Sequence, residues 1–423
     1  MKQIILILSL LFLTATPASA QSDGSGDPGA TGFISERLDR IDDVINAEIT
    51  AGKIPGAVAL VVKDGDVAYF KSFGYADIES QTPMRNDHIF RIASMSKAIT
   101  TVAAMVLYEQ GHFQLNDPVA DYIPAFANMS VVSEVDVDGN VSATVAATKP
   151  IRIIDLLTHT SGIGYPFIRN SVQKAYVDAG IIDGITAKKI TLASQMELLA
   201  NQPLMFEPGS QFAYSLSVDV LGYLVEVISG RSLAQFFAEE IFAPLGMQDS
   251  FFYLPEEKAG RLATLYADVG DRGLIVSKGN ESSIIFDEPL YPVIGARTYF
   301  SGGAGLSSTT SDYGRFLQML LNDGALDGRR ILSRKSVELM RTARVDWDDD
   351  NVPDMALGFQ VTADLGKTGE IGSVGSYSWG GAFNTSYWID PSENLLAVFM
   401  SQARPVDSDI RAKFSTVVYQ ALE

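Results

Sequence analysis

Ser94 and Lys97 stand three residues apart, at the point where an apolar stretch with helical periodicity begins. Positions i and i+3 share one face of a helix, so the lysine amine can lie beside the serine hydroxyl. A serine at a helix N-terminus also has unpaired backbone N–H groups near its oxygen. A hydroxyl next to an amine that can take its proton is an activated nucleophile. The same spacing recurs at Ser171 and Lys174, in a polar run that we interpret as a loop.

Two further features can join this pair. Tyr214 follows a turn at residues 207–209, and a phenol near an ammonium can serve as a second proton carrier. A buried core tyrosine is the alternative reading. Trp379, Gly380 and Gly381 precede a predicted strand. Adjacent glycines let a ligand approach a strand backbone, although a bulge or a tight turn would use the same residues.

Other chemistries have weaker support. His88 and His112 fall in polar turns and His159 in a helix end, the segment 156–162, which we interpret as a structural cap. None has a partner at the spacing of a catalytic triad or a metal site. The sequence has no Gly-x-Ser-x-Gly elbow and no phosphate-binding Gly-Lys-Ser/Thr loop. The acidic run 348–350 lacks the EF-hand spacing and is read as a solvated loop, so we expect no metal and no cofactor.

Composition narrows the class of protein. The 423 residues are 47% hydrophobic and 20% charged, which suits a large globular fold. The net charge of −19 argues against nucleic-acid partners and anionic membranes. There is no cysteine, so disulfides and thiolate metal sites are excluded.

The N-terminus resembles an export signal. Lys2 leads an apolar run, residues 4–13, and Ala18-Ser19-Ala20 provides a small-residue cleavage site. The run is too short to span a bilayer. We therefore expect an exported, periplasmic or extracellular bacterial protein that begins at Gln21 and has no membrane span after signal removal. The oligomeric state stays open.

Periodicity predicts the elements that must position these residues. A flexible leader at 21–32 precedes a helix at 34–52, and a turn at residues 64 and 65 joins two strands. A second hairpin is expected at 131–148. The predicted strands are 57–62, 67–70, 357–362, 383–389 and 395–401, and the further predicted helices are 151–158, 193–202, 217–228, 232–242, 311–322 and 333–342.

This order predicts an α+β fold. Strands at both ends of the chain must pair to bury their faces, which gives one antiparallel sheet flanked by helices. We expect an α/β lobe from about residues 33–110 and 295–423 and an inserted, mostly helical lobe from about 111–294. The site should lie in the crevice between the lobes.

Taken in order, these segments resemble the serine hydrolases of the β-lactamase and penicillin-binding fold. The similarity is greatest to the family VIII carboxylesterases, which are themselves similar to class C β-lactamases. It runs from about Ile34 to the C-terminus. The segments that carry it are 90–97, 155–162, 208–221, 244–247, 302–308 and 379–391.

The resemblance implies roles for individual residues. Ser94 would be the nucleophile, and Lys97 and Tyr214 its proton-transfer partners. The backbone N–H groups of Ser94 and Ala382 would form the oxyanion hole, where one donor is worth roughly 3–4 kcal/mol in a studied protease.

Departures from the β-lactamase pattern concern the substrate. Trp379-Gly380-Gly381 stands where β-lactamases carry Lys-Thr-Gly, whose lysine helps to bind the substrate carboxylate. A Lys-Thr-Gly at residues 367–369 lies in a Gly-rich loop away from that hairpin, so we do not assign it this function. Leu216 replaces the Asn that follows Tyr-Ser in many β-lactamases. With Trp379, Gly380, Gly381 and Leu216 as the expected substrate contacts, both changes favour a neutral ester.

The function expected is a serine carboxylesterase for small to medium acyl esters, a small-molecule substrate class. A β-lactamase or D-amino-acid peptidase is the main alternative, and weak β-lactam turnover is compatible with the esterase reading. An acyltransferase is a third option, because an acceptor other than water can intercept an acyl-enzyme. A hypothesis from a different functional class is a non-catalytic member of this fold that binds cell-wall fragments or a partner.

Overall fold

The structure is a computed structural model. It describes residues 21–22, 32–270, 273–279, 288, 290–348, 350–405 and 408–423. The predicted signal peptide, most of the predicted leader and residue 349 of the acidic run lie outside these ranges.

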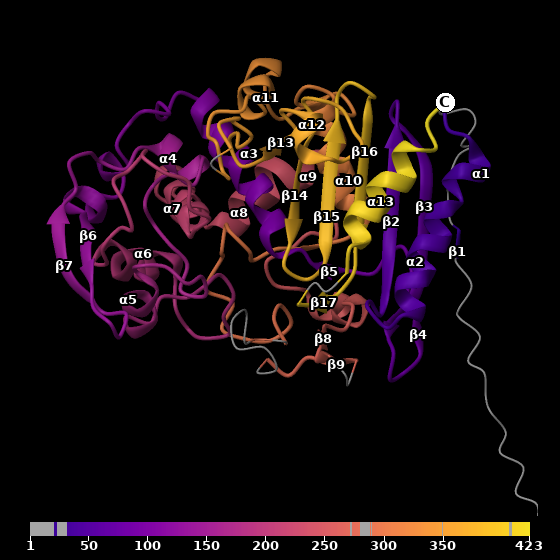
Figure 1. Ribbon diagram of the computed structural model, residues 1–423, viewed down its shortest axis with the longest axis horizontal. Coiled ribbons are helices and arrows are strands. Elements are labelled where there is room, and N and C mark those ends of the chain that lie inside the picture. The colour runs from indigo at the N-terminus through magenta and orange to yellow at the C-terminus, as the bar shows by residue number, and fades with distance from the viewer. Residues whose placement is uncertain are drawn as a thin grey trace, which may run out of the picture.

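One antiparallel sheet of eight strands forms the larger layer of the molecule (Figure 1). Its order is β1-β3-β2-β16-β15-β14-β13, with β4 paired to β3. The N-terminal strand β2 pairs directly with the C-terminal strand β16, so the prediction of a sheet built from both chain ends is confirmed. The strands of this sheet are β1 Gln21–Ser22, β2 Gly56–Lys63, β3 Asp66–Asp77, β4 Thr82–Pro83, β13 Gln360–Val361, β14 Tyr377–Gly381, β15 Thr385–Asp390 and β16 Leu395–Met400.

Alternating side chains of β2 supply two separate cores. Val58, Leu60 and Val62 join the larger core, whereas Ala57 and Ala59 join the smaller one on the other face. The helices α2 (Arg40–Thr50) and α13 (Ile410–Tyr419) cover the smaller core, and α10 (Thr310–Leu321) packs on β2 and β16 from the other side. The helix α3 (Ser96–Glu109) contributes to the same larger core as α10. Both faces of the central strands are therefore buried.

The remaining elements lie mainly beside the sheet, where Figure 1 shows α4 to α7 and the β6–β7 hairpin at the opposite end of the molecule from α2. The helices are α1 Ser35–Leu38, α2 Arg40–Thr50, α3 Ser96–Glu109, α4 Ile153–Leu157, α5 Gln173–Asp178, α6 Leu192–Ala200, α7 Ser217–Ser229, α8 Leu233–Phe237, α9 Ala243–Leu245, α10 Thr310–Leu321, α11 Arg334–Met340, α12 Leu365–Thr368 and α13 Ile410–Tyr419. The other strands are β5 Phe90–Arg91, β6 Ser130–Val135, β7 Val141–Ala146, β8 Tyr266–Asp268, β9 Leu274–Val276, β10 Ser307–Ser308, β11 Ala325–Leu326, β12 Arg329–Arg330 and β17 Ala403–Arg404.

Most predicted elements form where periodicity places them, with three differences. The predicted strand 357–362 is reduced to the two residues of β13. The predicted helix 232–242 breaks after α8 into a π-helical turn at Ala238–Phe242. The segment 367–369, predicted as loop, lies largely in the single-turn helix α12. The strand β14 and the helix α13 were not predicted at all, and both reach the candidate site.

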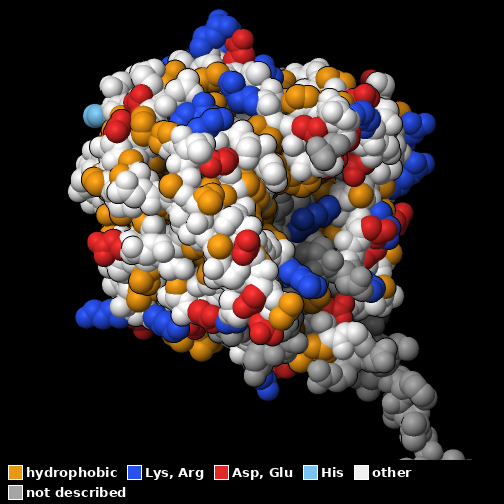
Figure 2. Space-filling model, turned by 60° about the vertical axis from the view of Figure 1, so that its left-hand side comes forward, with side chains coloured by type: hydrophobic (Ala, Val, Ile, Leu, Met, Phe, Trp, Pro, Cys, Tyr) orange, Lys and Arg blue, Asp and Glu red, His pale blue; other side chains and the backbone are white. Residues whose placement is uncertain are grey.

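Acidic and basic side chains are interspersed on the face shown in Figure 2, and hydrophobic side chains lie between them in small groups around a central hollow. Among the described residues, no helix is both long and apolar enough to cross a membrane.

The docking of α13 gives a first testable prediction. Phe414 is fully buried and its ring lies 5.3 Å from Trp388 and 5.8 Å from Phe399, measured between centroids. Phe414→Ala should lower the free energy of unfolding by about 3–5 kcal/mol, because it leaves a cavity under the helix. Urea denaturation measures this. Thr416→Ala on the exposed side of α13 is the control, expected to change stability by less than about 0.5 kcal/mol. Equal effects of the two variants would contradict the packing described.

Candidate active site

Ser94 lies in a single 3-10 turn, Ala93–Met95, immediately before α3. The turn follows β5, which pairs with β10. Ala93 has φ of +42°, a conformation that residues with a Cβ rarely adopt and that often marks functional sites. This position agrees with the prediction that Ser94 lies where a helix begins, because α3 starts two residues later at Ser96. The serine stands in a tighter, strained turn, and the lysine is in the first turn of the helix.

The structure brings Ser94, Lys97 and Tyr214 together. The Lys97 Nζ donates to Ser94 Oγ at 3.3 Å, and the Tyr214 hydroxyl donates to the same oxygen at 2.5 Å. Lys97 Nζ also lies 4.6 Å from the centre of the Tyr214 ring. One serine oxygen thus contacts both groups that the sequence predicted as its proton-transfer partners.

Two additional contacts hold the lysine, which is only 2% exposed. Its Nζ donates to the carbonyl oxygen of Gly303 at 2.8 Å and to the hydroxyl of Tyr165 at 3.2 Å. Burial, followed by the nearby Tyr214, raises the pKa of Tyr165 well above its usual value, so this phenol stays neutral. Neither residue was predicted, because no motif spacing connects residue 97 with residues 165 and 303.

The position of Tyr214 is fixed by the helix-end segment 156–162. The backbone N–H of Ala213 donates to the His159 carbonyl at 2.8 Å, and the His159 ring lies 5.0 Å from that of Tyr214. His159 Nδ1 bonds Ser215 Oγ at 3.1 Å. Burial, and then the charge of Lys97, lower the pKa of His159 well below its usual value. These contacts support the interpretation of segment 156–162 as a structural cap.

The two other histidines lie away from the site. His88 is buried and accepts a backbone N–H from Arg85 at 2.8 Å, whereas His112 is exposed in the turn after α3. Neither lines the cavity described below. The duplicate pair also lies elsewhere, since Ser171 precedes α5 in a turn and Lys174 pairs with Asp178 on the surface.

A cavity of about 670 Å³ opens beside Ser94. Aromatic rings form a continuous wall: Tyr165 contacts Phe167 and Tyr214, Tyr214 contacts Trp379, and Trp379 contacts Trp347, with centroid distances of 4.5 to 6.1 Å. Such a wall binds apolar and flat groups and keeps water from the reacting atoms. Trp347 was not anticipated by the sequence.

The glycine pair ends β14, next to the nucleophile. A Cβ on Gly381 would lie 2.3 Å from the Ile92 carbonyl oxygen, and one on Gly380 would lie 2.4 Å from a guanidinium nitrogen of Arg411. Glycine is therefore required at both positions because Ile92 and Arg411 pack closely against the strand, and not only to admit a ligand. Ala382 follows the pair and lines the cavity together with Ser94.

Arg411, on α13, lines the same cavity and was not predicted. Its Nη2 donates to the carbonyl of Gly381 at 2.6 Å, and burial lowers its pKa to about 10. The guanidinium thus holds the end of β14 and adds a positive charge to a cavity for which the sequence predicted a neutral ester.

Two other expectations need correction or refinement. Leu216 was predicted to contact substrate, but it is buried before α7, donates its N–H to the Gly164 carbonyl and does not line the cavity. Lys367 pairs with Asp350 at 2.9 Å, as expected for a residue outside the catalytic cluster. Its neighbour Thr368 does line the cavity.

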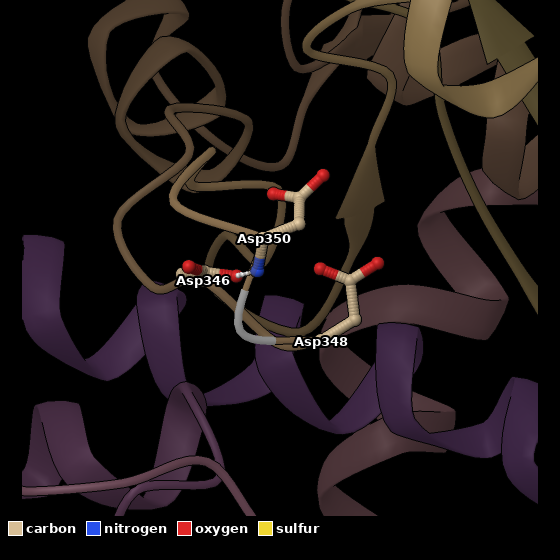
Figure 3. A group of neighbouring side chains, drawn as sticks. All are labelled: Asp346, Asp348 and Asp350. Carbon is tan, nitrogen blue, oxygen red and sulfur yellow. Dashed lines mark hydrogen bonds between the residues drawn. The ribbon is translucent and has the colours of Figure 1, made fainter.

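Figure 3 shows Asp346, Asp348 and Asp350, whose carboxylate oxygens lie within 4.8 Å of one another. Asp346 accepts the backbone N–H groups of Asp350 and Asn351 at 3.1 and 2.6 Å. Asp350 is paired with Lys367. These contacts shape the loop that presents Trp347 to the cavity, which agrees with reading the acidic run as a loop at the surface.

Comparison with protein-family models matches residues 41–419 to the family described as Beta-lactamase. The chain belongs to the beta-lactamase family. Protein Rv1367c of Mycobacterium tuberculosis (strain ATCC 25618 / H37Rv) is 34% identical over 370 residues, covering 84% of this chain and 87% of that protein. Esterase EstB of Burkholderia gladioli is 30% identical over 383 residues, covering 86% and 89%.

A solved structure gives the same answer for the fold. EstCE1, described as a hydrolase with promiscuous acyltransferase activity, superposes with a TM-score of 0.78 at 29% identity, covering 91% of this chain and 99% of that one. The relatives that match thus include hydrolases and acyltransferases of the beta-lactamase fold.

An experiment can distinguish the function of Lys97 from that of Lys367, the lysine of the Lys-Thr-Gly segment. Lys97→Ala should slow covalent labelling of Ser94 by a fluorophosphonate about 100-fold or more, because the amine next to the hydroxyl is lost. Lys367→Ala should stay within about twofold of the wild type, since its ammonium is paired with Asp350. Labelling kinetics with intact-protein mass spectrometry measure both. A large loss of labelling rate in Lys367→Ala, with Lys97→Ala unaffected, would contradict the assignment of proton transfer to Lys97.

Proposed function

We propose that this protein is an exported serine carboxylesterase that hydrolyses small to medium acyl esters through an acyl-enzyme on Ser94. The observation that carries the proposal is the single oxygen of Ser94 held between the Lys97 amine and the Tyr214 phenol, at the edge of an aromatic cavity. This arrangement provides a nucleophile, a proton acceptor and a proton donor without a metal or a cofactor.

The hydrogen bonds of Lys97 define how a neutral amine would work there. A neutral amine has two N–H donors and one lone pair. The Gly303 carbonyl can only accept, and the Tyr165 oxygen can accept the second N–H. The lone pair is then left to face the Ser94 hydroxyl and take its proton.

Acylation follows from these positions. Ser94 Oγ bonds to the ester carbonyl carbon while its proton passes to Lys97 Nζ, and the backbone N–H groups of Ser94 and Ala382 receive the oxyanion. When the tetrahedral intermediate collapses, the C–O bond to the alcohol breaks and the Tyr214 hydroxyl supplies the proton of the leaving alcohol. Lys97 returns its proton to Tyr214, which restores both groups.

Deacylation repeats the sequence with water. Water attacks the acyl carbon, loses a proton to the same pair and releases the acid, and the Ser94 oxygen regains its proton. The cycle therefore consumes one water and yields one acid and one alcohol for each ester.

Two observations support an ester over a lactam as substrate. Trp379 and Trp347 present apolar rings at the cavity, which favours uncharged substrates. The name of EstB and the description of EstCE1 as a hydrolase point to the same class of reaction. The Arg411 guanidinium, which lines the cavity, supports a hydrogen-bond acceptor on one part of the substrate, although one of its nitrogens already donates to the Gly381 carbonyl.

Acyl transfer is a second candidate. The aromatic wall can bind an apolar alcohol next to the acyl-serine and limit the access of water, and EstCE1 is described as having acyltransferase activity. With a p-nitrophenyl ester and added benzyl alcohol, we expect benzyl ester among the products by chromatography. Acid as the sole product, over a range of alcohol concentrations, would limit the function to hydrolysis.

The esterase proposal is tested by paired rates. We expect the protein from Gln21 onward to hydrolyse p-nitrophenyl butyrate with a larger kcat/KM than a chromogenic cephalosporin. Ser94→Ala should lower ester turnover by at least about 1,000-fold, because it removes the hydroxyl that forms the acyl-enzyme. Absorbance at the p-nitrophenolate band measures the rate, and circular dichroism confirms that the variant is folded.

Two outcomes would overturn this assignment. Undiminished ester turnover in folded Ser94→Ala would remove the nucleophile from its role. Cephalosporin turnover that exceeds ester turnover in the wild type and disappears in Ser94→Ala would move the function to β-lactamase.

A further inference from the structure

Asp219 is a buried carboxylate that the proposed mechanism leaves unused. It lies in the first turn of α7, five residues after Tyr214, and is 0% exposed. Its Oδ1 accepts the Ser301 hydroxyl at 2.5 Å and the Gly303 N–H at 3.4 Å, whereas its Oδ2 has no hydrogen-bond partner among the described residues. An incompletely paired buried carboxylate costs free energy of folding, so a function at this position would explain its presence.

The peptide groups of Gly303 connect this carboxylate to the catalytic lysine. The N–H of Gly303 points to Asp219 and its carbonyl accepts from Lys97 Nζ at 2.8 Å. A Cβ on Gly303 would lie 2.5 Å from Asp219 Oδ2, so only glycine allows the turn to come this close. Asp219 therefore holds, through one residue, the carbonyl that orients the Lys97 amine.

Other contacts hold the same turn without adding charge. Thr100 Oγ1, on α3, donates to the Gly302 carbonyl at 2.7 Å, and the Ala304 N–H donates to Ser301 Oγ at 3.1 Å. The glycine-rich segment 302–305 is thus fastened to α3 at one residue and to α7 at the next. This gives a matched pair of residues, Thr100 and Asp219, that differ mainly in charge.

The charge of Asp219 also bears on the proton transfer. Burial raises the pKa of Asp219, while the Ser301 hydrogen bond and the charge of Lys97 oppose this rise. The titratable groups that face it are Lys97, Tyr165 and Tyr299, and burial keeps both tyrosines neutral by raising their pKa values. Asp183 acts on the same two tyrosines. A carboxylate in this low-dielectric region stabilises the ammonium that forms when Lys97 takes the proton of Ser94.

We propose that Asp219 is a positioning residue for Lys97. It fixes the Gly303 carbonyl that directs the amine lone pair to Ser94, and its charge stabilises the ammonium formed during acylation. This inference rests on the proposed function, in which Lys97 accepts the proton of Ser94.

The test compares Asp219→Asn with Thr100→Val and the wild type. Asn keeps an oxygen acceptor and the size of the side chain but removes the charge. Fluorophosphonate labelling of Ser94 is followed across pH, together with kcat and KM for p-nitrophenyl butyrate and the melting temperature. Labelling does not require the correct ester, so a wild type that labels but does not turn over esters refutes the proposed function and still allows Asp219 to be tested.

For Asp219→Asn we expect a labelling rate about 10- to 100-fold below that of the wild type at its optimum, with kcat reduced more than KM is raised. Because a nearby carboxylate favours the ammonium over the amine, its removal should move the acid limb of the pH–rate profile to lower pH. Thr100→Val loosens the same turn without changing charge, so its acid limb should stay with that of the wild type.

Two results would overturn the proposal. One is a folded Asp219→Asn with a labelling rate within twofold of the wild type and an unmoved acid limb. The other is an equal loss of labelling rate in Asp219→Asn and Thr100→Val, with the acid limb of both pH–rate profiles unmoved. That result would indicate a structural role only. If Asp219→Asn does not fold, Ser301→Ala decides, because it removes one donor to the carboxylate. A smaller loss in rate is expected there, and an unchanged rate and limb would overturn the proposal.

Discussion

The burial of the Lys97 amine is the constraint on which the site depends. An amine with almost no contact with water must find its hydrogen-bond partners inside the protein, and here these are Ser94, Tyr165 and Gly303. The three partners come from the turn before α3, from the loop after α4 and from the glycine-rich segment before β10. Every one of these segments must therefore be in place before the lysine can face the serine. The requirement explains why the nucleophile lies in a turn packed against these segments and not on an exposed loop.

The C-terminal strands of the sheet help to position these segments around Ser94. β14 ends at Gly381 against the Ile92 carbonyl, two residues before Ser94, and Arg411 of α13 binds the Gly381 carbonyl from the other side. The cavity wall is thus tied to the sheet core by α13, whose Phe414 packs on Trp388 of β15. Because β2 pairs with β16, the N-terminal hairpin supports the same construction. A chain whose two ends did not pair would have no fixed position for Ala382 relative to Ser94.

Much of the fold and part of the site could be predicted from the sequence. The spacing of Ser94 and Lys97, the run of small and β-branched residues in β2 and the helical periodicity of α7 and α10 are local signals that the sequence contains in full. Tyr165, Gly303 and Asp219 lie far from Lys97 in sequence and meet it only through packing, so no spacing could indicate them. β14 was missed because its Trp-Gly-Gly end reads as a turn, and the predicted strand 357–362 shrank because only two of its residues find a partner in β14. Leu216 was misplaced because a position in a motif does not say which way a side chain faces.

Specificity depends on how the apolar wall and the charges of the site are arranged. The resemblance to β-lactamases implies that Trp379 occupies the position of their lysine. Its ring packs on Tyr214 and Trp347, so a substrate carboxylate at that point would lose its hydration without gaining a partner from this ring. Arg411 places a positive charge at the other side of β14, with one nitrogen already used by Gly381. We infer that a negatively charged group of the substrate is accommodated better near Arg411 than beside the Trp379 ring. From these two walls we infer a preference for substrates whose reacting ester carries an apolar group on the side of Trp379.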